Sequence, residues 1–266
     1  MKKLLTLLFV STSLISLTGC SKDDPYTIKI GASSTPHAEI LKAIQPLIEE
    51  KGYKLDIITF TDYITPNLAL EDGDIDANYF QHITYLNDFN VEYSTHLVSL
   101  GLIHYEQMAI YKGKKSNLND ISNGDTIIVP NDTTNEARAL LLLEQVGLID
   151  LDDSKGLKAT KNDIIDNPKN LNILEMNAEL IPGVKDDAAF AIINGNYALG
   201  AGLTISDSVA VEDGFGPARQ AYGNVVAVKE GKQNSEKSKV LLEALTSKTA
   251  KDYIKENYAG VVIPLF

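Results

Sequence analysis

Aromatic and polar side chains gather between Asp62 and Tyr85. This stretch holds Tyr63, Phe80, His82 and Tyr85, together with proline and glycine residues that favour turns. Aromatic rings beside a few convergent polar groups suit a pocket for a small, partly apolar ligand. The alternative is that these rings only fill the hydrophobic core. The residue types alone leave both interpretations open.

Two later segments place polar groups next to apolar ones. Arg138 falls at the start of a helix predicted over residues 136–146, where a cation is unfavourable for the helix itself, so a role beyond helix stability is expected. Otherwise it is a solvated surface arginine. Asn194 follows the apolar run Phe190–Ile193, and a polar group at the end of a buried strand can face a cleft. Otherwise it forms a turn beside Gly195.

The sequence carries no recognisable catalytic or metal motif. The histidines are His37, His82, His96 and His104, and no two of them have the close spacing of metal ligands. A Gly-x-Ser-x-Gly elbow and a phosphate-binding loop are absent, and Cys20 is the only cysteine. We therefore expect no catalytic residue, no metal and no cofactor, and we expect His82 to be a neutral ring beside the ligand.

The N-terminus has the pattern of an export signal. Lys2 and Lys3 precede an apolar run, Leu4–Leu17, which is about as long as a signal-peptide core. It is shorter than the roughly 20 apolar residues of a membrane-spanning helix. The run ends in Leu17-Thr18-Gly19-Cys20, which looks like a bacterial lipobox.

We therefore predict a signal peptide over residues 1–19, lipidation of Cys20 and a polar tether over residues 20–25. The acyl chain, such as palmitate, would anchor the protein at a membrane surface. The alternative is an ordinary secretory peptide with an incidental cysteine. Removing Lys2 and Lys3 takes the formal charge from −12 to −14. Such an acidic chain argues against a nucleic-acid partner, because nucleic-acid binders usually carry a basic patch.

Strand and helix patterns alternate along the chain. Alternation of apolar residues indicates strands, and apolar residues three or four apart indicate helices. The predicted elements are strands over 26–32, 53–60, 75–78, 126–129 and 188–193, and helices over 36–50, 64–71 and 136–146. This order favours an α/β fold of mostly parallel sheets flanked by helices.

Two separate strand–helix series suggest two lobes. The segments 107–114 and 224–232 are both apolar strands that run into a turn with lysine and glycine, so we place the two crossings between lobes there. The predicted organisation is a first lobe over residues 26–107, a second lobe over 108–224 and a return to the first lobe over 225–266.

Several motifs in order along the chain resemble those of the methionine-binding lipoproteins of ABC importers. They are Asp62-Tyr63, Pro66-Asn67, Asp74-Ile75-Asp76-Ala77-Asn78, Phe80-Gln81-His82, Pro130-Asn131-Asp132, Asn135, Arg138-Ala139-Leu140, Gly147-Leu148-Ile149, Asn167-Pro168-Lys169, Ile193-Asn194, Tyr197-Ala198, Tyr222 and Asn224. The sequence departs from the family pattern at Thr84 and after His104, where proline is common, and in a longer loop over 213–221.

The resemblance implies a periplasmic-binding-protein-like fold with an amino acid buried in a closed cleft between the lobes. It assigns the ligand carboxylate to Arg138 and the ligand's amino-acid backbone to Asn194 and Asn224. The ligand side chain would be enclosed by Tyr63, Phe80, His82 and Tyr85. An arginine can bind a carboxylate through two parallel hydrogen bonds, and a helix N-terminus favours an anion.

The resemblance also implies that the protein captures methionine outside the membrane and delivers it to an importer permease with its ATPase. Binding of a methionine-containing dipeptide, of another apolar amino acid, or a sensor role without transport remain as alternatives.

Overall fold

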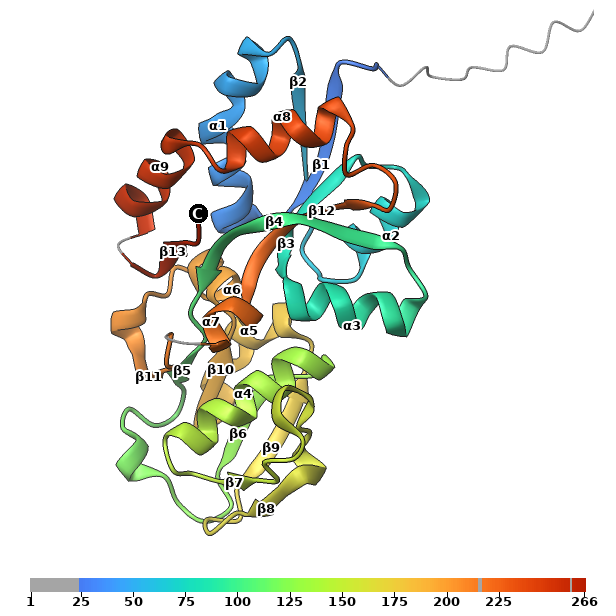
Figure 1. Ribbon diagram of the computed structural model, residues 1–266. Coiled ribbons are helices and arrows are strands. Elements are labelled where there is room, and N and C mark those ends of the chain that lie inside the picture. Colours follow the sequence, from blue (N-terminus) through green and yellow to red (C-terminus); the bar gives the residue numbers. More distant parts are fainter. Residues whose placement is uncertain (1–23, 215–216, 259) are drawn as a thin grey trace, which may run out of the picture.

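The computed structural model describes residues 24–214, 217–258 and 260–266, which form two bodies joined end to end (Figure 1). The predicted signal peptide and Cys20 lie outside these residues. The helices and strands follow the predicted order closely. For example, β1 spans Thr27–Ala32, and its Ile28 and Ile30 alternate into the core with no exposed surface. The described helices include none long and apolar enough to cross a membrane.

The first lobe is built on a six-stranded sheet. Its strands, in spatial order, are β13 (Val262–Pro264), β4 (Leu97–Glu106), β12 (Gly223–Lys229), β3 (Ala77–His82), β1 and β2 (Lys54–Thr59). Strand β1 is parallel to β2 and β3, whereas β12 runs antiparallel to β3 and β4, and β13 antiparallel to β4. Strands β1, β2, β3 and β4 therefore run in one direction, as expected of a mostly parallel sheet, and the return strands β12 and β13 run against them.

Helices cover both faces of this sheet. They are α1 (Glu39–Glu50), α8 (Glu236–Leu245) and α9 (Lys248–Tyr258) on one face, and α2 (Thr65–Asp72) and α3 (Ile83–Tyr93) on the other. Each face of the sheet packs into its own hydrophobic core, and alternate residues of β12 enter the two cores. Val226 and Val228 pack towards α1, and Val225 and Ala227 pack towards α2. Pro46 lies inside α1 and does not end it.

The second lobe is built on a five-stranded sheet. Its strands, in spatial order, are β11 (Ser208–Val211), β5 (Ala109–Lys112), β10 (Phe190–Ile193), β6 (Thr126–Pro130) and β9 (Asn172–Met176). Strand β6 is parallel to β9 and β10, and β5 is antiparallel to β10 and β11, so this sheet is mixed as well. The predicted α/β fold with two lobes is confirmed, and in this sheet β5 runs against the other strands.

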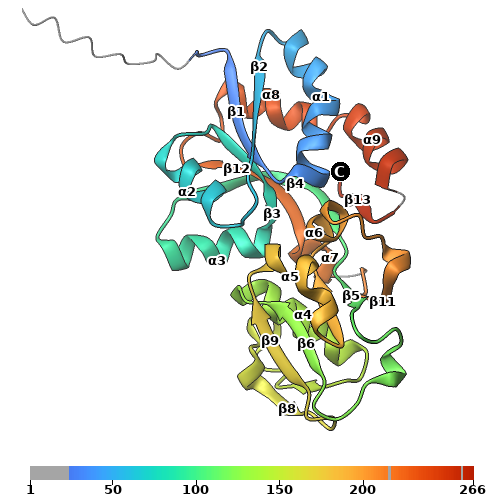
Figure 2. The same cartoon turned by 180° about the vertical axis from the view of Figure 1, so that it is seen from behind.

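The remaining elements surround this second sheet or join the lobes. They are α4 (Thr133–Gln145), α5 (Ile181–Val184), α6 (Gly195–Gly200), α7 (Pro217–Ala221), β7 (Asp150–Leu151), β8 (Ile164–Asp166), a π-helical turn η1 (Ser34–Ala38), and the 3-10 turns η2 (Leu118–Asp120), η3 (Gly156–Lys158), η4 (Lys161–Asp163), η5 (Ala178–Leu180), η6 (Lys185–Asp187) and η7 (Ile205–Asp207). Helix α6 lies where the two lobes meet in both views (Figures 1 and 2) and contacts η1 of the first lobe.

The chain passes between the sheets twice. It leaves the first sheet after Glu106, at the end of β4, and it returns between Val211 and Gly223. The backbone N–H of Met108, in the first passage, donates to Glu212 in the second (2.6 Å). We propose lobe limits close to those expected from the sequence, except that residues 223–224 already pair within the first sheet.

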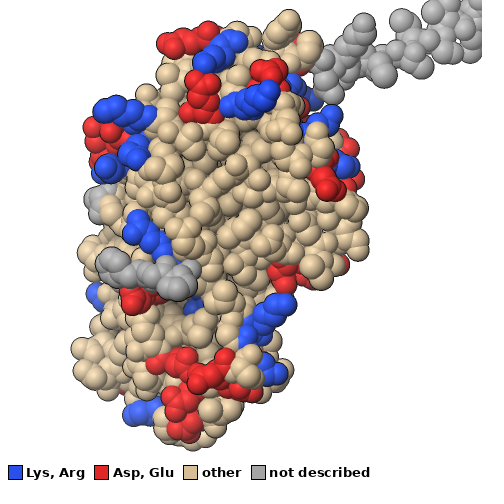
Figure 3. Space-filling model, in the orientation of Figure 1, with Lys and Arg blue, Asp and Glu red and all other residues tan. Residues whose placement is uncertain are grey.

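Charged residues are distributed unevenly over the surface. On the face shown in Figure 3, lysines and acidic residues are interspersed over the end of the first lobe, and acidic residues gather on the second lobe. A broad area between these two ends has few charges.

Candidate ligand-binding site

A cavity of about 330 Å³ lies between the two lobes. The first lobe contributes Tyr63, Phe80, Gln81, His82, Tyr85, Glu106 and Asn224, and the second contributes Asn135, Arg138, Asn194, Gly195 and Asn196. All seven residues predicted to bind the ligand therefore line one cavity.

The sheets bring these residues together through the ends of their strands. His82 and Glu106 are the last residues of β3 and β4, and Asn194 directly follows β10. Asn224 is the second residue of β12 and is paired with His82, because that strand runs antiparallel to β3. The cavity therefore lies at the strand ends where the two sheets face each other, a common place for ligand sites in α/β folds.

One end of the cavity is aromatic. Tyr63 lies with its ring centroid 5.9 Å from Phe80 and 5.7 Å from Tyr85, and these rings form one hydrophobic cluster. The hydroxyl of Tyr63 donates across the cleft to Asn196 Oδ1 (2.6 Å), and that of Tyr85 donates to the carbonyl of Tyr63 (3.1 Å). The rings thus pack against each other and also form the cavity wall.

His82 is held as a neutral ring. The backbone N–H of Tyr85 donates to its Nδ1 (3.0 Å), so the ring proton is on Nε2, which lies 3.2 Å from Asn135 Oδ1. Burial, and then the nearby Arg138, lower the pKa of His82 to about 3. The ring is therefore uncharged at neutral pH and can contact an apolar side chain.

Arg138 is buried, and its bidentate partner is a residue of its own lobe. Its Nε donates to Glu212 Oε2 (2.8 Å), and its Nη2 donates to Glu212 Oε1 and to the carbonyl of Glu106 (2.6 Å). Burial lowers the pKa of Arg138, but Glu212 raises it by more, so the guanidinium stays charged. In the described part of the chain, no hydrogen bond leaves Nη1, and this is the atom available to a ligand carboxylate.

Two expectations about Arg138 therefore need correction. Helix α4 begins at Thr133, three residues earlier than predicted, so Arg138 is in its second turn rather than its first. The two parallel hydrogen bonds expected to reach a ligand instead reach Glu212, which the sequence analysis did not single out.

Two asparagines present opposite ends of their amides to the cavity. Asn194 donates from Nδ2 to Asn135 Oδ1 (2.7 Å), and its own Oδ1 is buried with no partner among the described residues. Asn135 is in turn held by Asp132, which accepts from its Nδ2 at 3.0 Å. Asn224 accepts at Oδ1 from His37 Nε2 (3.1 Å), and its Nδ2 donates to none of the described residues. Asn194 therefore offers an acceptor and Asn224 a donor.

Glu106 is a buried carboxylate in the cavity wall that the sequence analysis did not predict to bind the ligand. Its Oε1 lies 2.7 Å from His104 Nε2 and 3.4 Å from His37 Nε2. Burial raises the pKa of Glu106, and the nearby His37 and Arg138 oppose that rise. A ligand cation beside it would favour its charged form. Its position was visible in the sequence only as the departure from the family pattern after His104.

His37, His104 and Glu106 have ligand atoms within 4.8 Å of one another, as a metal site would. This grouping could not be foreseen from the sequence, because the fold and not the spacing brings the residues together. Hydrogen bonding explains it better. The 2.7 Å between His104 and Glu106 is shorter than the ~3.3 Å separation of ligand atoms that a tetrahedral zinc ion imposes. The Nδ1 atoms of the two rings are also bound, to Ser33 and Tyr79.

A second, wider cavity of about 840 Å³ adjoins the first and shares Tyr63 and Tyr85 with it. Its lining includes five carboxylates, those of Asp62, Asp88, Glu92, Asp132 and Glu179, and no lysine or arginine. Beyond the aromatic end of the site, the cleft is therefore acidic.

Comparison with known proteins agrees with this geometry. The model of the NlpA lipoprotein family matches residues 28–266. The methionine-binding lipoprotein MetQ of Bacillus subtilis is 41% identical over 247 residues, which are 90% of this chain and 88% of that protein. A solved structure from Ruminococcus gnavus, described as a lipoprotein, is 50% identical with a TM-score of 0.89 and covers 91% of this chain and 100% of that one. A nutrient-binding protein from Burkholderia cenocepacia, solved with bound methionine, is 37% identical with a TM-score of 0.85, at 90% and 100% coverage.

Proposed function

The chain belongs to the NlpA lipoprotein family, and we propose that it is a lipid-anchored solute-binding protein that captures methionine outside the membrane and delivers it to an ABC importer. The family resemblance inferred from the sequence motifs is confirmed by relatives named as methionine-binding lipoproteins. A related structure contains methionine, and another is that of a periplasmic substrate-binding protein of an ABC transporter.

The observation that carries this proposal is the division of the cavity into a polar end and an aromatic end. Arg138 Nη1 and Asn224 Nδ2 are donors that suit a carboxylate, and the free Oδ1 of Asn194 and the carboxylate of Glu106 suit an ammonium group. Together they match the two charged groups of an α-amino acid. The aromatic end favours a thioether by about 0.3–1.5 kcal/mol for each contact between sulfur and a ring.

Anchoring at Cys20 would hold the protein beside the permease and its ATPase, on the outer face of the membrane. Capture and release require no chemical step, and the cavity residues all have binding roles in this proposal, so we propose no enzymatic activity.

The ligand is best identified directly. The mature protein, purified gently in detergent, should carry methionine that native mass spectrometry detects. After removal of that ligand by unfolding and refolding, calorimetry should rank methionine first, with leucine and norleucine weaker by about 1–3 kcal/mol.

Glutamate and lysine should not bind measurably. Glutamate would meet an aromatic wall and an acidic outer cavity without a cation, whereas lysine is the stricter test because that outer cavity could attract its ammonium group. If glutamate or lysine displaced methionine, the proposed ligand would be wrong. If a methionine-containing dipeptide bound more tightly than methionine, the transport role would stand with a different substrate.

A further inference from the structure

His37 is a buried residue beside the cavity that has no role in the binding scheme above. It has no exposed surface and is the penultimate residue of the turn η1, which leads into α1. Its ring bridges Ser33 Oγ, 2.6 Å from Nδ1, and Asn224 Oδ1, 3.1 Å from Nε2. Glu106 Oε1 lies on the same side, 3.4 Å from Nε2. His37 therefore contacts two residues of the cavity wall without lining the cavity.

These contacts fix which nitrogen of His37 carries the proton. A carbonyl oxygen can only accept, so the bond to Asn224 Oδ1 requires a hydrogen on Nε2. The hydroxyl of Ser33 then donates to Nδ1. The other tautomer would point the Nε2 lone pair at the oxygens of both Asn224 and Glu106, which is repulsive. Burial lowers the pKa of His37 to about 4, so the ring is neutral at physiological pH.

The proton on His37 in turn fixes the amide of Asn224. If that amide were turned over, its NH₂ group would meet the Nε2 hydrogen of His37, and its oxygen would face the cavity. With His37 in place, the oxygen is occupied, and the NH₂ group is left free in the wall of the cavity that Arg138 also lines. A ligand carboxylate can accept from both of these donors.

We propose that His37 is a positioning residue that orients the Asn224 amide as a donor to the ligand carboxylate. The inference rests on the proposed function, because it assumes an amino-acid ligand. Ser33 and Glu106 assist by holding the tautomer of His37. The same arrangement distinguishes Asn224 from Asn194, which Asn135 holds the other way round, with its oxygen towards the cavity.

A double-mutant cycle tests this positioning role with methionine as the probe, measured by calorimetry on the mature protein. His37→Leu should weaken binding about tenfold, the effect of losing one well-aligned hydrogen bond. In an Asn224→Ala background, the same change should have almost no further effect, because the amide that His37 orients is gone. His37→Gln should restore binding to within about threefold, because its amide N–H can replace the ring N–H.

Two further variants make the cycle interpretable. His104→Leu removes another buried histidine, which is paired with Asn224 in the sheet but whose side chain bonds to Glu106 and Tyr79 and not to the Asn224 amide, so its loss of affinity should largely add to that of Asn224→Ala. Ser33→Ala disturbs His37 without removing a ring from the core, so it remains informative if His37→Leu does not fold. It should weaken binding about threefold in the parent and leave Asn224→Ala unaffected.

The positioning role would be overturned if the affinity losses at His37 and Ser33 added to the affinity loss at Asn224. It would also be overturned if His37→Leu bound methionine within twofold of the parent. Failure of the parent to bind methionine would instead contradict the proposed ligand. The coupling between His37 and Asn224 would then be measured with the amino acid found by native mass spectrometry.

Discussion

Substitutions in the buried pair of Arg138 and Glu212 should affect protein stability and ligand affinity in different ways. The two side chains are 4% and 9% exposed and belong to the same lobe, yet only Arg138 lines the cavity. We expect Arg138→Met to reduce both stability and methionine affinity. We expect the double variant Arg138→Met with Glu212→Gln to recover stability but not affinity.

The magnitudes follow from burial. Arg138→Met leaves the Glu212 carboxylate buried without its cation, and breaking one side of a buried pair lowers the free energy of unfolding by about 3–5 kcal/mol. Replacing both charges is often neutral, so the double variant should lie within about 1 kcal/mol of the parent. Glutamine retains an oxygen that can accept from Tyr105 and Met108, as Glu212 does. Loss of the ligand contact should weaken binding by about 2–5 kcal/mol in both variants that lack Arg138.

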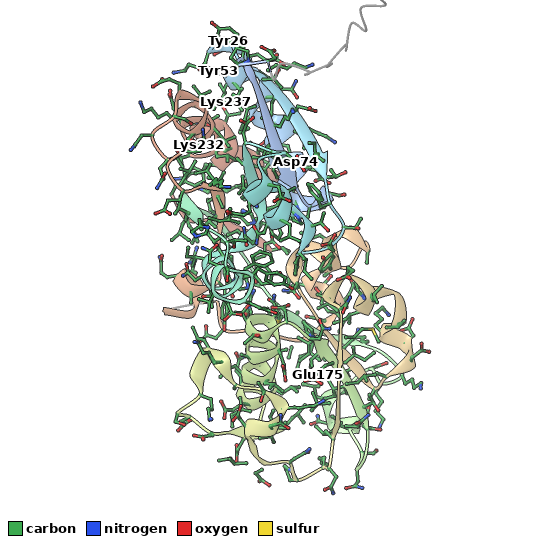
Figure 4. The ribbon with its side chains drawn as sticks, turned by 90° about the vertical axis from the view of Figure 1, so that its right-hand side faces the viewer. Tyr26, Tyr53, Asp74, Glu175, Lys232 and Lys237 are labelled. Atoms are coloured by element: carbon green, nitrogen blue, oxygen red, sulfur yellow. The ribbon has the colours of Figure 1, made fainter. Side chains whose placement is uncertain are left out.

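The assay combines denaturant unfolding and calorimetry on the parent, both single variants and the double variant. A matched control is the pair Lys237 and Asp76, neither of which lines the cavity, with Lys237 on α8 towards the end of the first lobe (Figure 4). These side chains are 23% and 33% exposed, so Lys237→Met should change stability by about 1 kcal/mol or less and leave affinity unchanged. Recovery of methionine binding in the double variant would refute the assignment of Arg138 to the ligand carboxylate.

Three further outcomes are expected. Cys20→Ala should release the protein from the membrane fraction, and unchanged anchoring would show that the lipobox interpretation is wrong. Tyr63→Phe should speed methionine release about fivefold in stopped-flow measurements, because the closed cleft loses the hydrogen bond to Asn196; an unchanged rate would contradict a role in closure. Burial and the nearby Glu175 raise the pKa of Glu136 to about 7, so the folded protein holds this proton more tightly than the unfolded chain. The stability that this proton adds is present below about pH 4.5 and is lost as the pH rises through 7. Glu136→Gln should therefore be about 1–2 kcal/mol more stable than the parent at pH 8 and similar at pH 4.5, and an equal difference at both pH values would exclude this linkage.

The local elements were predictable where periodicity was strong. Strand β1, helix α1 and strand β6 lie within a few residues of their predicted positions, because their apolar residues follow a clear period of two or of three to four. The directions of β12 and β13 were not predictable. They depend on where the chain returns to the first sheet, which is a long-range property that local patterns do not contain.

The site was predictable to the extent that family motifs mark it. All seven predicted ligand residues line the cavity, but their bonding partners were not foreseen. Glu212 and His37 are far in sequence from the residues they hold, and neither stands in a recognisable motif. Glu106 was visible only as a departure from the expected pattern, and the fold was needed to show that this departure places a carboxylate in the cavity wall.

In the proposed function, the placement of these partners explains how a small cavity can bind both the carboxylate and the ammonium group of an amino acid. Arg138, Asn194 and Asn224 each have one side bound to a buried protein group, namely Glu212, Asn135 and His37. Each therefore directs its remaining donor or acceptor at the ligand without the freedom to rotate. These side chains lose their rotational freedom when the protein folds, so the entropic cost of ordering them is not added to the cost of binding the ligand. The same contacts require both lobes, since Asn224 belongs to the first sheet and Arg138 and Asn194 to the second. An amino acid that engages all three thus holds the lobes together, and its binding energy is linked to closure of the cleft.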